Sequence, residues 1–311
     1  MNETTFLIFS IIKRALISGT PLLLGTLGEI YTERSGVLNL GIEGMMAIGA
    51  VSGFGLTLIT KNPWFGLVFA IFFGILLSLV HAFVSITLRG NQTISGLSIS
   101  MLGLGISGFW GKAYIGTPLK YKFQDVTIPI LNKIPFLGEL IFKGDPIFYI
   151  SLILTFVLWF ILYKTKWGII IRSCGENPLA SDSMGINVYI VRYICVVIGG
   201  ALAGMAGAYL SLAYASSWIE GMTGGRGWIV IALTIFSLWN PVRALLGAYL
   251  FGGIYILQYI LQQYYKISPN ILLMLPYIGT ILVLLLSANE TLRKRIGAPK
   301  FLGEPYIKEE K

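Results

Sequence analysis

Histidine, cysteine and charged residues are scarce in this chain of 311 residues, and each shortage excludes a class of protein. The single histidine, His81, cannot supply a His-based metal site. The two cysteines, Cys174 and Cys195, do not make a disulfide framework. Charged residues form only 12% of the chain, against roughly 25% in a soluble domain. The chain is therefore predicted to be an integral membrane protein and not a soluble enzyme.

Motifs for chemistry on nucleotides, metals or esters are missing as well. A phosphate-binding loop needs Gly-x4-Gly-Lys-Ser/Thr. The single Gly-Lys pair, Gly111-Lys112, is followed by Ala113 and has Ile106 where the first glycine belongs. Neither His-Glu-x-x-His nor Gly-x-Ser-x-Gly occurs. We expect no catalytic residue, no metal and no cofactor in this chain.

Apolar sequence is what the chain has in abundance, at 55% hydrophobic residues. A helix needs about 20 apolar residues to cross the bilayer core. We predict an all-α, polytopic membrane protein with one transmembrane domain over residues 1–311 and about nine (8–10) spans. The seventh stretch is short and ends at the turn Asn240-Pro241-Val242-Arg243, so it is either an upright span or part of a broken helix. The nine stretches are roughly 6–27, 39–60, 64–88, 93–111, 146–163, 188–211, 226–239, 243–262 and 269–287.

The net charge of +9 is distributed between the apolar stretches and in the C-terminal tail. No basic face or stripe is apparent, which argues against a nucleic-acid partner. Lysine and arginine instead collect on the cytoplasmic side of membrane proteins. The tail, residues 289–311, carries Arg293, Lys294 and Arg295 beside the last stretch, so we place it in the cytoplasm.

The same orientation predicts the sides of the other connections. Residues 164–187 fall in the cytoplasm, and residues 112–145 fall outside although they carry more lysines than acids. An odd number of spans puts the N-terminus outside. Lys13 and Arg14 then lie within the first stretch, where we expect them to pack against other helices.

The first of two hydrophilic interruptions covers residues 28–46. Glu43 lies about one turn inside the second apolar stretch, and an ionisable group at membrane depth faces a cavity or a partner. Arg34 is a candidate partner for Glu29 or Glu33. Glycines in the segment indicate irregular backbone, which lipid tolerates only beside protein or water. The alternative is an interfacial loop with ordinary ion pairs.

The second interruption covers residues 172–188. Asn177 before Pro178 is typical of a helix start, and Gly185 is typical of a helix end. We therefore predict a short helix over Pro178–Met184 that docks another protein. An ordered loop without a partner is the alternative.

Three segments resemble motifs of one family. Residues 33–46 resemble a hallmark of the permease subunits of nucleoside and simple-sugar ABC importers, within the wider family of ribose and branched-chain amino-acid permeases. Residues 175–188 look like the family's coupling loop, and residues 88–96 are a third match. The coupling loop commonly has alanine where this chain has Ser181 and Ser183. The resemblance covers roughly residues 10–300.

The resemblance implies a multi-pass protein of the cell membrane that imports a nucleoside, or a simple sugar, by alternating access. Separate ATPase subunits would supply the energy, and a second permease chain, in a heterodimer, would complete the path through the lipid membrane. An extracytoplasmic binding lipoprotein would deliver the substrate. The residues implied for contact with the ATPase are Glu176, Asn177, Pro178, Ala180, Asp182, Gly185 and Ile186.

Polar residues at span ends are the candidates for lining the substrate path. Amide side chains offer donors and acceptors that suit sugar hydroxyls or a purine edge. The same groups also hydrogen-bond between helices, which is the alternative. The candidates are Asn39, Glu43, Asn91, Gln92 and Ser95.

Other classes of membrane protein remain open alternatives. A secondary transporter or channel that works without ATP would use an intramembrane acid, for which Glu43 is the candidate. An intramembrane enzyme lacks its motifs here, and a structural subunit would have no path of its own.

Overall fold

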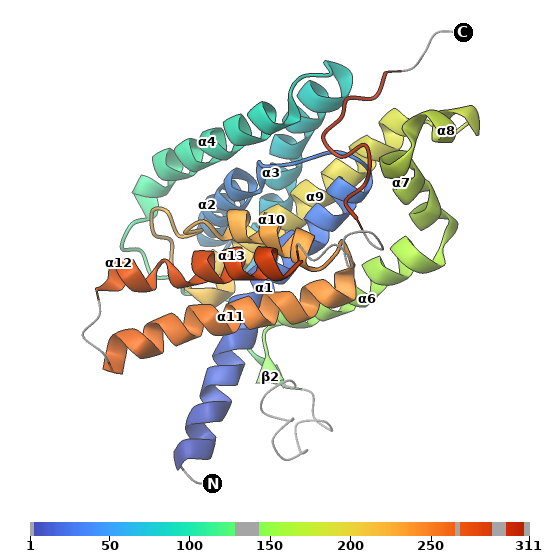
Figure 1. Ribbon diagram of the computed structural model, residues 1–311. Coiled ribbons are helices and arrows are strands. Elements are labelled where there is room, and N and C mark those ends of the chain that lie inside the picture. The colour runs from blue at the N-terminus through green and yellow to red at the C-terminus, as the bar shows by residue number, and fades with distance from the viewer. Residues whose placement is uncertain (1–2, 128–142, 265–267, 288–296, 308–311) are drawn as a thin grey trace.

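A computed structural model describes residues 3–127, 143–264, 268–287 and 297–307. The predicted basic cluster Arg293–Arg295 lies outside these residues. The fold is helical apart from one short antiparallel pair of strands, β1 (Val126–Thr127) and β2 (Lys143–Gly144) (Figure 1). The helices are α1 (Glu3–Arg34), α2 (Ile42–Thr60), α3 (Pro63–Ala82) with the π-helix η1 (Phe83–Thr87), α4 (Gln92–Gly111) with the short 3-10 helix η2 (Lys112–Tyr114), α6 (Pro146–Lys164), α7 (Lys166–Glu176), α8 (Pro178–Ser183), α9 (Val188–Tyr209) with the π-helix η4 (Leu210–Tyr214), α10 (Arg226–Phe236), α11 (Pro241–Tyr264), α12 (Pro269–Leu272) and α13 (Leu275–Ser287).

The prediction of a polytopic helical membrane protein is confirmed, but the count of nine spans is not. Among the described residues, six helices are long and apolar enough to cross a membrane. The seventh predicted stretch forms α10, which has only 11 residues. At 1.5 Å per residue such a helix covers about 16 Å, roughly half of the bilayer core. Of the two alternatives for this stretch, the structure has the broken helix.

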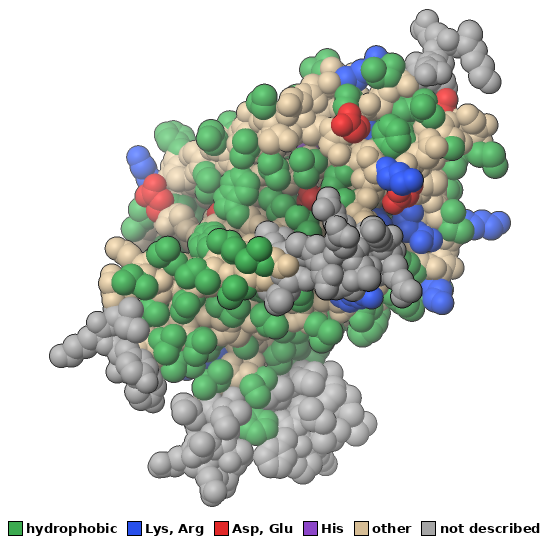
Figure 2. Space-filling model, viewed as in Figure 1, with side chains coloured by type: hydrophobic (Ala, Val, Ile, Leu, Met, Phe, Trp, Pro, Cys, Tyr) green, Lys and Arg blue, Asp and Glu red, His purple; other side chains and the backbone are tan. Residues whose placement is uncertain are grey.

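The outer surface of the bundle suits contact with lipid. Phe72, Met101 and Phe156 are half or more exposed on α3, α4 and α6. Figure 2 shows hydrophobic side chains over much of this face, while most basic side chains in view gather toward the end that carries α7 and α8. The N-terminus lies at the opposite end of the bundle (Figure 1).

The two halves of the chain contain the same arrangement of helices, and corresponding helices run in opposite directions. Residues 62–74 and 240–252 share six identical positions, including the Asn-Pro start and the final glycine. Asn62 accepts a hydrogen bond from the Trp64 backbone N–H, and Asn240 does the same for Val242. Helix α3 follows this start in the first half, and α11 follows it in the second.

Glycine contacts show that the two halves also pack alike. Gly74 of α3 lies against the backbone of α9 at Gly204, and Gly252 of α11 lies against the backbone of α1 at Gly19. Helices α1 and α9 are antiparallel, since Gly28 meets Gly199 while Thr32, further along α1, meets the earlier Cys195. The fold is therefore an inverted repeat, an architecture in which transporters place their sites at interrupted helices.

Candidate functional site

Helix α10 begins inside the bundle, and its first backbone N–H groups face a carboxylate. Glu43, in the first turn of α2, accepts hydrogen bonds from the Thr223 hydroxyl at 2.6 Å, the Gly225 N–H at 2.9 Å and the Gly227 N–H at 2.6 Å. Its side chain is buried. A helix N-terminus carries partial positive charge that favours an anion. Glu43 therefore attaches the start of α10 to α2.

Glycine is required at this junction because the helices approach so closely. A Cβ on Gly227 would lie 2.5 Å from the Cα of Glu43. Gly225 has a φ of +77°, in the left-handed region that favours glycine. Gly225 and Gly227, on either side of Arg226, thus both belong to this contact.

The other end of α10 is held by the last turn of α1. Glu33 accepts a hydrogen bond from the Trp239 indole N–H at 2.5 Å. Arg34 donates from Nη2 to the Leu238 carbonyl at 3.2 Å and lies 5.7 Å from the centre of the Trp239 ring. Leu238 and Trp239 both have positive φ angles, which end the helix. Residues from one motif, 33–46, therefore hold both ends of α10, and we call Glu33, Arg34 and Glu43 the α10 clamp.

Arg34 does not form the ion pair considered for it from the sequence. Within the described ranges no salt bridge joins it to Glu29 or Glu33, and its guanidinium binds a backbone carbonyl on α10 instead. The interfacial loop with ordinary ion pairs is likewise wrong, because Glu29, Glu33 and Glu43 are all buried.

Between the clamp residues the chain runs back into the bundle as the re-entrant segment, residues 35–41. The Asn39 backbone N–H donates to Glu29, and the Asn39 side chain accepts from the Gly41 N–H. The Gln92 side-chain oxygen accepts from the Leu38 N–H at 2.7 Å. Buried polar groups in a protein are expected to find such partners. Side chains thus satisfy the N–H groups of Leu38, Asn39 and Gly41, whereas the N–H groups of residues 35–37 donate to carbonyls in the last turns of α1.

His81 completes the support of the re-entrant segment and was not singled out from the sequence. One ring nitrogen lies 3.1 Å from the Leu38 carbonyl oxygen, and the other lies 3.0 Å from the Ser95 hydroxyl. The histidine is fully buried. A lone histidine in an apolar helix carries no signal of this role, because Leu38 is 43 residues away.

The structure brings most of the candidate path residues to one place. Asn39, Gln92 and Ser95 are buried around the re-entrant segment, and Glu43 lies at its end. Asn91 is separate, since it is exposed and caps α4 by accepting from the Ile94 N–H. The side chains of Asn39, Glu43, Gln92 and Ser95 all form hydrogen bonds within the protein.

The predicted short helix at residues 178–184 is confirmed as α8 (Pro178–Ser183). The Asn177 side chain caps it by accepting from the Ala180 N–H at 3.0 Å, and Gly185 ends it with a φ of +81°. Ser181 faces inward and donates to the Ser173 hydroxyl. The serine in place of alanine is therefore accommodated against α7.

The candidate docking residues are unequally exposed. Asn177, Ala180 and Gly185 are exposed, whereas Glu176, Asp182 and Ile186 are half-buried and Pro178 is buried. Two apolar side chains that were not selected, Leu179 and Met184, are 42% and 82% exposed. An apolar side chain on a polar loop was the available signal, because exposed hydrophobic groups mark contact surfaces.

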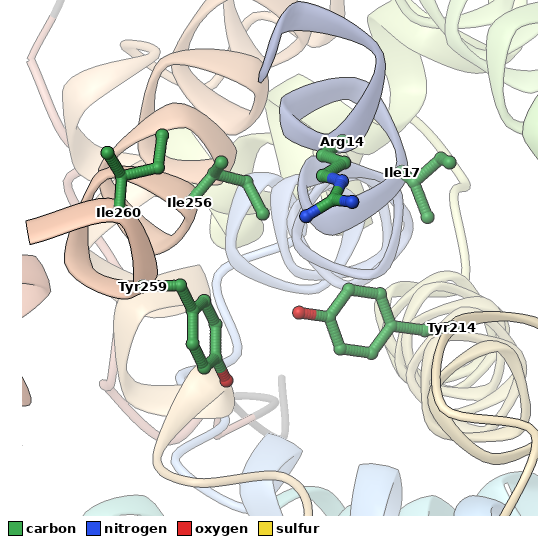
Figure 3. A pocket seen from close by; sticks show the side chains of 6 residues that line it. All are labelled: Arg14, Ile17, Tyr214, Ile256, Tyr259 and Ile260. Carbon is green, nitrogen blue, oxygen red and sulfur yellow. The ribbon is translucent and has the colours of Figure 1, made fainter. Parts of the chain in front are cut away.

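A pocket of about 310 Å³ opens between α1, η4 and α11. Figure 3 shows the Arg14 guanidinium and the rings of Tyr214 and Tyr259 pointing toward the opening. Beside the pocket, Arg226 at the start of α10 lies 5.5 Å from the Tyr214 ring centre. Lys13 is 3.9 Å from the Asp125 carboxylate. Lys13 therefore contacts the connection after η2, while Arg14 is exposed at the pocket.

Comparison with known proteins identifies the family. The model of the family described as "branched-chain amino acid transport system / permease component" matches residues 11–284. A putative glucose ABC transporter permease protein of Haloferax volcanii is 40% identical, with 94% of this chain and 95% of the relative covered. A guanosine ABC transporter permease protein of Bacillus subtilis is 40% identical, with 96% of each chain covered. A nucleoside ABC transporter permease protein of Lactococcus lactis is 32% identical over the same shares.

No solved structure matches this chain. The family match covers most of the sequence, and the apolar helices agree with it. The resemblance stated from residues 33–46, 88–96 and 175–188 is therefore confirmed. The chain belongs to the family of permease components of branched-chain amino acid transport systems, as a multi-pass protein of the cell membrane and a transport subunit rather than an enzyme.

Proposed function

We propose that this chain is the permease subunit of an ABC importer that moves a nucleoside inward by alternating access. The observation that carries the proposal is the half-helix α10, held at both ends by the hallmark motif. Relatives named for guanosine and nucleosides favour a nucleoside. A simple sugar is the second candidate, since another relative is named for glucose.

In this proposal the half-helix α10 is the element that changes position during transport. A helix that ends inside the bundle has few lipid contacts to hold it and depends on the polar groups at its ends. Loosening Glu43 or Glu33 would allow α10 to tilt without breaking a full span. Discontinuous helices are a common site of gating and binding in transporters.

The five polar candidates divide into two roles in this scheme. Asn39, Gln92 and Ser95 shape the re-entrant segment, and Glu43 positions α10. In this scheme these four residues support the elements that line the path and do not contact the substrate. Asn91 lies exposed at the start of α4 and would meet the substrate near the exit. The pocket at Arg14, Tyr214 and Tyr259 would lie at the outer entrance, because it is near the end of the bundle opposite α8.

Energy would come from ATPase subunits that bind α8. The exposed side chains of Leu179 and Met184 suit an apolar cleft, with the cap at Asn177 and the turn at Gly185 shaping the helix. A second permease chain, in a heterodimer, and an extracytoplasmic binding lipoprotein complete the proposed system. Glu176, Asp182 and Ile186 border the same surface.

Uptake into proteoliposomes tests the proposal. The chain is reconstituted with its ATPase subunits, second permease chain and binding lipoprotein, and labelled guanosine or glucose is added outside. We expect guanosine to accumulate only when ATP is present on the ATPase side. Accumulation of glucose alone would change the substrate class. Uptake driven by an ion gradient without ATP would overturn the importer and favour a secondary transporter.

A further inference from the structure

The C-terminal segment 297–307, here called the C-terminal strap, is bound to two functional parts of the molecule. The Phe301 N–H donates to the Gly175 carbonyl of α7 at 3.0 Å. Two residues on, the Gly303 N–H donates to the Gly36 carbonyl of the re-entrant segment at 3.2 Å. Gly303 has a φ of +83°, so the turn between these bonds favours glycine. The strap therefore joins the end of α7 to the re-entrant segment.

Arg192 of α9 makes a second connection between the strap and the re-entrant segment. Its Nε donates to the Ser35 carbonyl at 3.2 Å, and its Nη1 donates to the Glu304 carbonyl at 3.1 Å. The side chain is 1% exposed. A buried guanidinium that loses a partner is left unsolvated, which makes these bonds costly to break.

The strap also reaches α8. Tyr306 is buried, and its ring lies 5.3 Å from the ring of Tyr189 on α9. Burial, together with the carboxylate of Asp182 beside it, raises the pKa of the Tyr306 hydroxyl. Asp182 belongs to α8, so the strap lies beside the predicted docking helix and is bonded to α7.

Close packing leaves little room for these parts to move separately. A Cβ on Gly175 would overlap the Arg34 carbonyl oxygen, and a Cβ on Gly36 would lie 2.8 Å from Arg192. Arg34 is itself part of the α10 clamp. A continuous chain of contacts thus runs from α8 through the strap and Arg192 to both ends of α10.

We propose that Arg192 and the C-terminal strap form a relay that transmits displacement of α7 and α8 to the re-entrant segment and so to the α10 clamp. The relay rests on the proposed function, because it presumes that an ATPase moves α8. Arg192 is a positioning residue in this scheme and touches no substrate. Through the strap, α8 and the α10 clamp would move together.

The test measures ATP hydrolysed per guanosine imported in proteoliposomes of the complete importer. The variants are Arg192→Ala, Gly303→Val and a chain that stops after Gly297. We expect each to hydrolyse ATP while importing less, which raises the ratio about tenfold. Gly116→Val is the matched control, since Gly116 also has a positive φ, of +76°, and lies in the connection after η2 with open space around it.

The outcomes separate a relay from a merely structural role. A structural role would lower the amount of folded protein and reduce hydrolysis and uptake together, with an unchanged ratio, and that result would overturn the relay. Should Arg192→Ala not insert, the truncated chain and Gly303→Val decide in the same way. If the wild type shows no ATP-driven uptake, the proposed function fails and the relay with it. If the wild type is coupled and the variants match it, the relay alone fails.

Discussion

The two hydrophilic interruptions of the sequence have opposite fates in the fold. Residues 28–46 are almost wholly buried, and their polar side chains bind partners inside the bundle: Glu43 accepts from the Gly225 N–H, and Glu29 accepts from the Asn39 N–H. Residues 172–188 keep α8 at the surface, with Met184 82% exposed. Both segments carry glycine and charge, so polarity alone does not tell a surface loop from an internal support.

The difference follows from where unpaired backbone arises. The break between α1 and α2 and the start of α10 leave N–H and C=O groups inside the bundle, where water cannot satisfy them. Polar side chains must then come to those groups. At α8 the helix ends face outward, so Asn177 and Gly185 are exposed there and accessible to a partner.

Removing the charge of Glu43 tests the buried segment most severely. Glu43→Gln keeps the shape but turns an NH2 group toward one of two N–H donors, because Gly225 and Gly227 bind different carboxylate oxygens. We expect a loss of about 3 kcal/mol in the attachment of α10, or about a hundredfold in uptake. The control is Glu220→Gln, an exposed acid in the same connection. Wild-type uptake by Glu43→Gln would show that the carboxylate does not hold α10.

Gly185→Val tests the exposed segment. Nothing lies within 4 Å of the added Cβ, so the change acts through the φ of +81° at the end of α8. We expect normal membrane insertion and continued ATP hydrolysis, with about ten times more ATP used per guanosine. Gly116→Val again serves as the control. Transport at the normal ratio would mean that the shape of α8 is unimportant for coupling.

Trp239→Phe tests the other end of the α10 clamp. The change removes the Trp239 indole N–H, which donates to Glu33, and leaves a buried carboxylate oxygen of Glu33 without that hydrogen bond. We expect the free energy of unfolding in detergent to fall by about 2 kcal/mol. Trp228→Phe is the matched control, because Trp228 lies at the start of α10 and is 37% exposed. An equal effect of both changes would point to lost aromatic packing instead.

Thiol labelling compares the buried Cys174, near the start of the segment 172–188, with the exposed position of Met184 at the end of α8. Burial raises the pKa of the Cys174 thiol above its ordinary value. Because a raised pKa keeps the thiol protonated, the reactive thiolate is scarce at pH 7 to 8, and labelling accelerates only as the pH nears the raised pKa.

The measurement uses a maleimide on the folded protein. We expect slow labelling of Cys174 in a Cys195→Ser background and fast labelling of Met184→Cys in a chain without the native cysteines. Rapid reaction of Cys174 at pH 7 would contradict its burial.

Local features were well predicted from the sequence. Each of the nine apolar stretches is largely helical, although the ninth is divided between α12 and α13 and the seventh runs past the end of α10. Helix α8 has the predicted proline start and glycine end. These features depend on runs of apolar residues and on caps, which neighbouring residues decide. The number of full spans was less secure, because length alone does not show where a helix such as α10 is interrupted.

Long-range features were not predicted. Thr223 is 180 residues from Glu43, and the Trp239 donor is 206 residues from Glu33, so no local pattern announces either pairing. The inverted repeat left a trace in the shared Asn-Pro starts at Asn62 and Asn240. That similarity is short, and only the antiparallel packing of α1 against α9 shows that it marks an inverted repeat.

The sequence by itself determined that the chain lies in a membrane, which family it resembles and where its helices run, because burial of apolar segments in lipid depends on composition over about 20 residues. Only the tertiary structure decided that residues 33–46 hold α10 at both ends and that the C-terminal strap joins α7 and α8 to them. The reason is that hydrogen bonds between distant segments depend on how the helices meet, and many sequences with the same apolar pattern could meet differently.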